Sequence, residues 1–164
     1  MKIAIVSDTH NNTANFKKAI DWIKKEKIQL ILHCGDISSQ ETIDEAREIF
    51  GEDNEIKFVR GNADFGLNLP EKLEIEVEGS PSPEASARRR KIAFCHFPNN
   101  AKKMAQSGKY NAVFYGHTHR PWDEKVGEAH MINPGELAGQ FYKSTFTVYD
   151  TITGNLELKI LEKL

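Results

Sequence analysis

The first sixty residues alternate between short apolar runs and amphipathic stretches, and this alternation most narrows the folds open to the chain. Residues 3–6, 30–32 and 56–59 have the apolar character and length of buried strands. Between them, residues 13–27 place Phe16, Ala19, Ile20 and Ile23 at helical spacing, with Thr13 as the expected cap. A second helix is expected from Ser38 or Ser39 to a stop at Gly51. The order strand, helix, strand, helix, strand predicts an α/β fold whose first half is a parallel sheet with right-handed crossovers.

The second half of the chain has a different pattern. Residues 73–77 alternate apolar and charged side chains, which is typical of a half-buried strand, and we expect them to form a hairpin with residues 91–95. The intervening segment 79–90 is rich in Ser, Pro and Arg and is expected to be an exposed, mobile loop. A helix over 99–107 and strands over 112–115, 131–132, 145–149 and 156–161 complete the expected elements. The sequence contains no repeat and no linker, so one domain over residues 1–164 is predicted.

Composition limits the class of protein. Hydrophobic residues make up 39% of the 164 residues, charged residues 28%, and the formal net charge is -2. This balance does not indicate a nucleic-acid or membrane partner, and the apolar runs are too short to span a bilayer. A cytoplasmic protein without a signal peptide is expected, with both cysteines as thiols.

Polar side chains follow five of the apolar strands at the point where each ends. They are Asp8, His10, Asp36, Asn62, His96, His117 and His119. The carboxyl ends of strands are where α/β sheets bind ligands, and these side chains offer carboxylate, amide and imidazole donors. Seven donors are too many for one ion but suit two ions about 3.5–4 Å apart that share a carboxylate.

The pair His117 and His119 fits such a centre particularly well. On an extended backbone, side chains two residues apart point to the same side about 6.6 Å apart, so each imidazole can reach a different ion. Gly35, Gly61 and Gly116 stand beside the candidate ligands, as expected where the backbone passes close to the ions.

These motifs resemble those of the calcineurin-like metallophosphoesterases. The series D-x-H, G-D, G-N, H and G-H-x-H occurs in the family's order over essentially the whole chain. The opening MKIAIVSDTH, the form G-N-A-D and the later INPGE resemble the small archaeal and bacterial phosphodiesterase branch. The resemblance implies a four-layer αββα sandwich of two mixed β-sheets.

The resemblance also implies a role for each candidate ligand. Asp8, His10 and His119 would bind the first ion, Asn62, His96 and His117 the second, and Asp36 both. A hydroxide held between the ions would attack phosphorus in line. The expected activity is therefore a metal-dependent phosphodiesterase, a hydrolase. Mn is the favoured metal, with Ni, Fe, Co or Zn as alternatives.

Two departures from the family pattern bear on this activity. Relatives with G-N-H-[DE] protonate the leaving group with a histidine, and here Ala63 occupies that position. Asp64 remains and is expected to orient a ligand rather than bind metal. After His96 the sequence reads Phe97-Pro98 where the family has a glycine, which alters the loop beside the second ion.

Several interpretations stay open at this level. Asn11 could contact a substrate phosphate or cap the following helix. His33 is expected to be structural, and the run from Arg88 to Lys91 to be a solvated hairpin end. The substrate is expected to be a small phosphodiester or nucleotide-like molecule, selected by loops 63–72, 97–100 and 120–128, with nucleic acid and a homo-oligomer as alternatives. A phosphomonoesterase and a non-catalytic scaffold resembling the retromer subunit are the rival functions.

Overall fold

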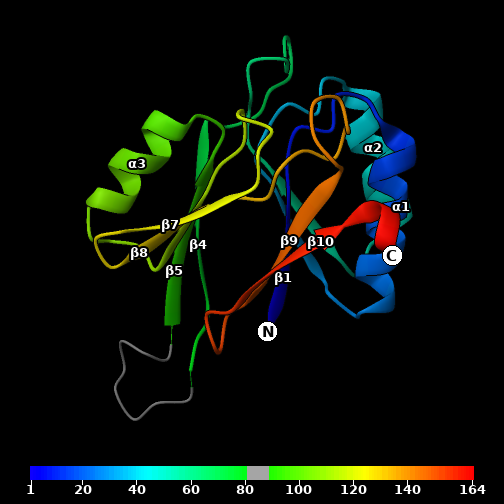
Figure 1. Cartoon of the computed structure of the whole chain (residues 1–164). Helices are drawn as coiled ribbons and strands as arrows, with labels where there is room; N and C mark the ends of the chain where they lie inside the picture. The colour runs from blue at the N-terminus through cyan, green and yellow to red at the C-terminus, as the bar shows by residue number, and fades with distance from the viewer. Residues whose placement is uncertain (81–88) are drawn as a thin grey trace.

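Two five-stranded β-sheets lie face to face, with helices on both outer surfaces (Figure 1). The computed structural model describes residues 1–80 and 89–164. The first sheet has the order β10-β9-β1-β2-β3, with bounds β1 Lys2–Val6, β2 Leu30–His33, β3 Glu55–Phe58, β9 Thr145–Asp150 and β10 Leu156–Ile160. The second has the order β4-β5-β6-β8-β7, with bounds β4 Lys72–Glu78, β5 Arg89–Cys95, β6 Ala112–Phe114, β7 Trp122–Val126 and β8 Ala129–Asn133. The helices are α1 Thr13–Lys25, α2 Gln40–Phe50, α3 Pro98–Gln106 and the short η2 Leu161–Lys163.

The parallel first half of the chain is confirmed. Strand β1 pairs in parallel with β2, and β2 with β3, while α1 and α2 form the crossovers between them. Antiparallel β9 extends this sheet beyond β1. The predicted hairpin is also present, because β4 and β5 pair antiparallel with Ile75 opposite Ile92. Both sheets are therefore mixed, as the four-layer architecture requires.

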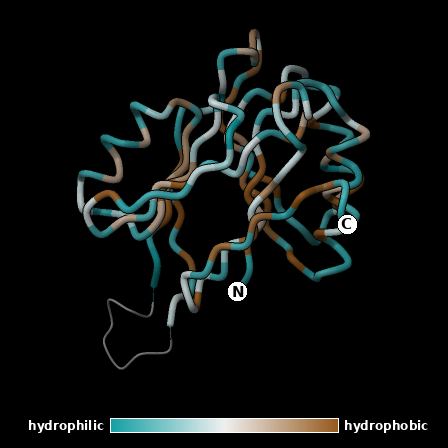
Figure 2. Tube along the Cα trace, in the orientation of Figure 1, coloured by the Kyte–Doolittle hydropathy of each residue, from teal (hydrophilic) through white to brown (hydrophobic). Residues whose placement is uncertain are grey.

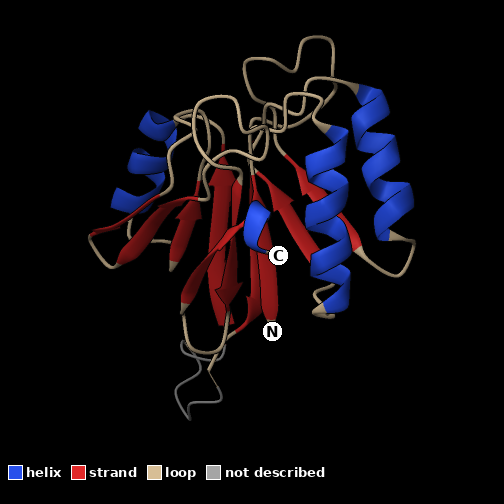
Figure 3. Cartoon of the chain, turned by 45° about the vertical axis from the view of Figure 1, so that its right-hand side comes forward, coloured by secondary structure: helices blue, strands red, loops and turns tan. Residues whose placement is uncertain are grey.

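Apolar side chains fill the three spaces between the four layers. Along β1, Ala4 and Val6 pack toward α1 and α2, whereas Ile3 and Ile5 pack toward the second sheet. Because this strand is covered on both faces, it reads as a continuous apolar run rather than an alternating one. Figure 3 shows α1 and α2 together on one side of the sandwich and α3 on the other. Figure 2 shows the hydrophobic segments concentrated on the strands between these helices.

The helix ends agree with the sequence at α2 and differ at α1. Ser39 caps α2 by accepting from the Thr42 N–H, and Gly51 ends that helix, as predicted. The cap of α1 is Asn12, whose Oδ1 accepts from the Asn15 N–H. The predicted cap at Thr13 is wrong because the backbone already turns into the helix one residue earlier, where a second good capping residue stands.

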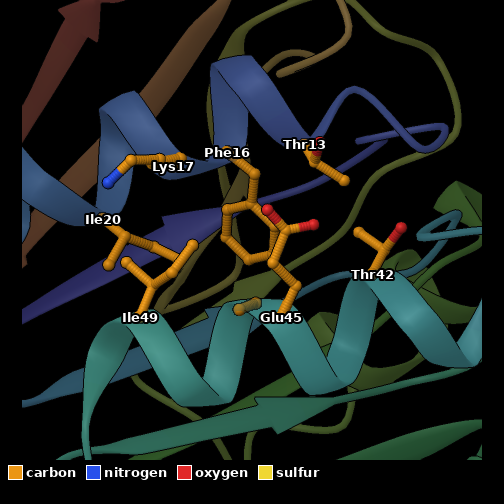
Figure 4. A pocket seen from close by; sticks show the side chains of 8 residues that line it. Thr13, Phe16, Lys17, Ile20, Thr42, Glu45 and Ile49 are labelled. Carbon is orange, nitrogen blue, oxygen red and sulfur yellow. The ribbon is translucent and has the colours of Figure 1, made fainter.

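The contact between α1 and α2 is built by their own side chains. Figure 4 shows the Phe16 ring pointing from α1 toward α2, where Glu45 and Ile49 line the same shallow groove. Phe16 is buried, so the groove is filled by packing. Within the residues that the structure describes, no helix has the length and apolar character needed to cross a bilayer.

The segment 120–128 is not the loop that the sequence predicted. It contains β7, which pairs antiparallel with β8 and places Trp122 opposite Asn133. β7 is an edge strand with mostly exposed residues, so no apolar alternation marks it in the sequence. The predicted loop 97–100 is likewise shortened, because α3 begins at Pro98.

Arg90 links the basic run to the first sheet. The Arg90 Nε donates to the carbonyl oxygen of Thr151 at 2.6 Å, which joins β5 of the second sheet to the turn after β9 of the first. Arg89 forms an exposed ion pair with Glu76. Arg88 and the central part of the predicted mobile loop, residues 81–88, lie outside the described residues.

Candidate metal centre

All seven candidate ligands lie at one end of the sandwich, in the loops that follow strands of both sheets. The first sheet supplies Asp8, His10, Asp36 and Asn62, and the second supplies His96, His117 and His119. Two overlapping groups have ligand atoms within 4.8 Å of one another: Asp8, His10 and His119, and Asp8, Asp36 and His96. The sequence prediction thus identified residues that the fold does bring together.

In the first group, the side chains of Asp8, His10 and His119 lie close to one another. The rings of His10 and His119 stack with centroids 5.1 Å apart. The Nε2 of His119 lies 3.5 Å from Oδ1 of Asp8, and the Nε2 of His10 lies 3.9 Å from the same oxygen. These three atoms therefore converge on one small space, as three ligands of one ion would.

Asp36 belongs to the second group but also lies close to the first. Its Oδ2 is 3.7 Å from the Nε2 of His10 and 3.4 Å from the Nε2 of His96. A carboxylate shared by two ions needs such a position, with a donor of each group on either side. Asp8 also belongs to both groups, so geometry alone leaves two carboxylates able to be shared.

Asn62 and His117 complete the second side of the centre. The Oδ1 of Asn62 lies 3.1 Å from the Nε2 of His96 and 2.9 Å from the Nδ1 of His117. Asn62 and His117 are exposed, whereas Asp8, Asp36 and His96 are buried. The centre is therefore open to solvent on the side of Asn62 and His117, where a substrate could approach.

The hydrogen bonds of the histidines fit the binding of cations. The Nδ1 of His96 lies 2.8 Å from the carbonyl oxygen of Cys34, which can only accept, so this nitrogen carries the proton. In the same way, the Nδ1 of His119 donates to the buried carboxylate of Glu136 at 2.8 Å. In the neutral rings, both Nε2 lone pairs then point into the cluster, which is the arrangement found in metal-binding histidines.

A buried atom without a partner supports the same conclusion. Among the described residues, the Nε2 of His10 is buried and has no hydrogen-bond partner. A buried polar atom without a partner costs about 1–3 kcal/mol. A cation between His10, Asp8 and Asp36 would satisfy this nitrogen, so the residues present fit a divalent metal.

The pKa values show how strongly the carboxylates and His96 depend on one another. Burial raises the pKa of Asp8. Burial also acts to raise the pKa of Asp36, but hydrogen bonds from His96 and the Ala63 N–H lower it below its ordinary value. Burial acts to lower the pKa of His96, but its contact with Asp36 raises the pKa above the ordinary value. Burial and the contact between Asp36 and His96 therefore act on the pKa values of these two groups in opposite directions.

The backbone at the centre adopts an unusual conformation. Asp8, His10, Asp36, His117 and His119 have φ between 46° and 71°, the left-handed region. This region costs non-glycine residues about 1–2 kcal/mol each, and such strain concentrates at functional sites. This conformation turns side chains from separate strands toward one point, and the surrounding structure maintains it.

Two glycines make room for the carboxylates. A Cβ at Gly61 would lie 2.1 Å from the Oδ1 of Asp36, and one at Gly116 would lie 2.7 Å from the Oδ2 of Asp8. Neither distance is compatible with a side chain, so only glycine allows this approach of the backbone.

Asp64 lies beneath the centre and accepts three backbone hydrogen bonds. Its Oδ2 accepts from the N–H groups of Asp36 and Gly61, and its Oδ1 from that of Ser38. Asp64 is 2% exposed. It therefore holds the loop that carries Asp36 against the loop that leads to Asn62.

Glu136 is a supporting residue that the sequence reasoning missed. It is fully buried, and besides His119 its carboxylate accepts from the backbone N–H groups of Gln140, Phe141 and Tyr142. The signal available in the sequence was its place in INPGE, which indicated a resemblance to the phosphodiesterase branch but no contact with His119.

The remaining polar candidates have contacts outside the cluster. Asn11 accepts from the Thr42 hydroxyl and does not cap α1, so that alternative is wrong. The Nε2 of His33 contacts the hydroxyl of Thr9, and its Nδ1 accepts from the Gly35 N–H. His33 is fully buried among these partners, which is consistent with a structural role.

Comparison with known proteins identifies the family of this fold. The family model of the calcineurin-like phosphoesterase superfamily domain matches residues 1–154. A phosphodiesterase of Methanocaldococcus jannaschii is 33% identical over 144 residues, which cover 85% of this chain and 86% of that protein. A solved archaeal phosphodiesterase superposes with a TM-score of 0.82 at 28% identity, covering 98% of this chain and 99% of the other.

A more distant likeness concerns the fold alone. The wild-type Vps29 of Entamoeba histolytica, solved in complex with Zn²⁺, has a TM-score of 0.70 at 18% identity and covers 97% of each chain. The match over nearly the whole chain and the convergence of the family's motifs at one end of the sandwich lead to one conclusion. The chain belongs to the calcineurin-like phosphoesterase superfamily.

Proposed function

We propose that the protein is a phosphodiesterase that depends on two divalent metal ions. The single observation that carries the proposal is the pair of overlapping ligand groups, which share Asp8, with Asp36 of the second group also 3.7 Å from His10 of the first. Its membership of a phosphoesterase family and its likeness to archaeal phosphodiesterases support the reaction class.

The chain would hold the two ions with the residues already described. Asp8, His10 and His119 would hold one ion, Asn62, His96 and His117 the other, and Asp36 would contact both. When bound, the ions would lower the pKa of water to near neutral and neutralise charge on the phosphoryl oxygens. The ligand set has no thiolate and suits Mn, with Ni, Fe, Co or Zn as alternatives.

The chain's own residues would leave one side of the centre open to the substrate and hold the ligand histidines in place. Asn62 and His117 form the exposed side of the centre, so the phosphoryl group would approach there. Glu136 fixes the ring of His119 and Cys34 fixes the ring of His96, which keeps both imidazoles aimed at the cluster. Such fixed orientation lowers the entropy cost of reaching the reactive geometry.

The residue at position 63 favours phosphodiesters with good leaving groups over phosphomonoesters with poor leaving groups. Ala63 contributes its backbone N–H to Asp36 and has no side chain that could protonate a leaving oxygen. Substrates with a good leaving group need this proton least. We therefore place activated phosphodiesters ahead of alkyl phosphomonoesters as substrates.

Metal content and turnover of an aryl phosphodiester test the proposal together. Elemental analysis after loading with Mn is expected to give two ions per chain, and bis(p-nitrophenyl) phosphate is expected to be hydrolysed. Asp36→Ala is the matched control because it removes the shared carboxylate. Turnover no higher than that of Asp36→Ala, in protein shown to contain metal, would leave the scaffold alternative standing and overturn the phosphodiesterase.

A further inference from the structure

An open cleft of about 510 Å³ lies on the outer surface of the second sheet, between α3 and the β7–β8 hairpin. This volume is in the range of small-molecule sites, which run from about 300 to 1,000 Å³. Its lining includes Pro98, Lys102, Thr118, Arg120, Trp122 and Tyr142. No candidate metal ligand is among them, so the cleft is a feature separate from the centre itself.

Three segments of the chain connect the cleft to the metal centre, and the first two carry Thr118 and Pro98. Thr118, which lines the cleft, stands between His117 and His119. Pro98 follows Phe97, whose ring packs on those of His96 and His117. A phosphorus atom bound at the centre would therefore carry one of its two ester arms toward this cleft.

A third wall, formed by Tyr142, is tied to the centre as well. Its backbone N–H donates to Glu136, the carboxylate that orients His119. The neighbouring Phe141 packs edge-on against the His119 ring with centroids 5.0 Å apart. Glu136 therefore supports both the Tyr142 wall of the cleft and the candidate ligand His119.

The lining combines aromatic surface with positive charge. Trp122 is 48% exposed and Tyr142 is 49% exposed, so both rings offer faces to a ligand. The Arg120 guanidinium lies 5.4 Å from the centre of the Trp122 ring. Lys102 and Arg120 have no ion-pair partner among the described residues, and Glu124 is the only carboxylate of the lining.

Aromatic faces beside unpaired cations recognise a ligand that is both flat and anionic. Bases stack on aromatic side chains, and arginine adds both stacking and charge. Lysine and arginine bind phosphate through charge-assisted hydrogen bonds. An uncharged lipid arm would leave the two cations without a partner, and a sugar phosphate would leave the two rings without one.

We propose that this cleft binds a nucleotide arm of the phosphodiester substrate, with the base stacked on Trp122 and Tyr142 and a second phosphate of that arm bound by Arg120 and Lys102. The inference rests on the proposed phosphodiesterase function for the identity of the scissile bond. It adds a substrate class: phosphodiesters in which one arm is a nucleoside that carries a phosphate of its own.

The first test is a binding measurement on metal-free protein, so its outcome does not depend on turnover. The chain has two tryptophans, and Trp22→Phe leaves Trp122 as the only one. Thymidine 3′,5′-bisphosphate is expected to quench Trp122 emission in this background. Thymidine or 2-deoxyribose 5-phosphate alone is expected to bind about tenfold more weakly, because each lacks one of the two recognised groups.

Variants assign the binding to the cleft. Arg120→Gln in the Trp22→Phe background is expected to weaken binding of the bisphosphate about tenfold. Lys125→Gln is the matched control, since Lys125 is an exposed lysine of β7, the strand that follows Arg120, and does not line the cleft. Unchanged emission on adding the bisphosphate, or equal affinity in Arg120→Gln, would overturn the nucleotide site. Equal binding of thymidine alone would overturn the role of the two cations.

The second test compares two substrates that release the same p-nitrophenolate. They are thymidine 3′-phosphate 5′-(p-nitrophenyl phosphate) and ethyl p-nitrophenyl phosphate. The nucleotide ester is expected to have a kcat/KM at least about tenfold higher, and Arg120→Gln is expected to reduce this ratio. Equal kcat/KM for both esters would refute the cleft, whereas no turnover of either ester alongside binding in the first test would refute only the phosphodiesterase.

Discussion

Removal of the Asp64 carboxylate should destabilise the protein more than its position in a loop suggests. Asp64 is 2% exposed and accepts from three backbone N–H groups, at 2.9 Å from Asp36, 2.7 Å from Ser38 and 2.7 Å from Gly61. In Asp64→Ala these three donors lose their partner. Each unsatisfied buried donor costs about 1–3 kcal/mol, and partial access of water to Ser38 reduces the total to about 3–6 kcal/mol.

Asp64→Asn separates the charge from the shape of the side chain. The amide oxygen can replace the carboxylate oxygen that accepts two bonds, but the amide NH₂ group then faces the Ser38 N–H. One lost bond and one donor–donor contact predict a loss of about 2–4 kcal/mol, less than in Asp64→Ala.

Urea unfolding followed by circular dichroism in EDTA measures both losses, since EDTA removes any contribution from bound metal. Asp53→Asn is the matched control, because Asp53 is exposed and should change the free energy of unfolding by less than about 0.5 kcal/mol. A loss below about 1 kcal/mol in Asp64→Ala would refute the reasoning. It would mean that the three donors find other partners and that Asp64 does not organise the loops.

Three further changes test two supports of the centre and the buried His33. Glu136→Gln should weaken metal binding about 10–100-fold, measured by competition with a chelator, because it removes the charge that orients His119. Gly61→Ala should reduce the content of both ions, measured by elemental analysis, because its Cβ would lie 2.1 Å from the Oδ1 of Asp36, the carboxylate that would contact both. His33→Gln should flatten the loss of stability on acidification, measured by urea unfolding between pH 7.5 and 4.5.

The sign of the pH effect follows from the burial of His33. Burial lowers its pKa from 6.5 to about 3, so below pH 6.5 the unfolded chain binds a proton that the folded protein does not. The stability contribution is therefore fully present above pH 6.5. It falls by up to about 1.4 kcal/mol per pH unit as the pH decreases toward 3. An equally steep loss in His33→Gln would assign the effect to other groups.

Matched controls exist for the two site variants. Glu128→Gln changes an exposed glutamate and should leave metal affinity unaltered. Gly66→Ala places a Cβ where no described atom lies within 4 Å, at a φ of +76°. It should cost about 1–2 kcal/mol of stability through backbone strain but leave metal content intact. Loss of metal in Gly66→Ala as well would show that general destabilisation, rather than the collision with Asp36, explains Gly61→Ala.

The sequence predicted the elements that have an apolar pattern and missed an edge strand that has none. Strand β1 and helix α2 have their own apolar pattern, so their existence could be predicted from a few residues. Strand β7 has the sequence WDEKV, lies almost entirely exposed at the edge of its sheet and forms a hairpin with β8, so only the turn at Gly127 and Glu128 could have marked it.

The candidate ligands were predictable for a related reason. Residues such as Asp8 and His96 follow apolar strands, and in a parallel arrangement the ends of such strands meet. The supports of the centre were less visible. Glu136 acts on a histidine 17 positions away and on three backbone groups, a set of contacts that exists only in the folded chain. The nucleotide cleft was equally hidden, because Lys102 and Trp122 come together only through the packing of α3 on the second sheet.

The division of the candidate ligands between the two sheets has a mechanical consequence. The close-packed apolar interior resists both separation and sliding of the layers, and polar bonds between the sheets add to this at their ends. At one end of the sandwich, Arg90 bonds across the layers to Thr151. At the other end, His96 contacts the carbonyl oxygen of Cys34 and the His117 N–H donates to Asp8, so the layers are joined there without cations. Bound cations would add to these bonds, so the supply of metal would increase the rigidity of that end of the fold.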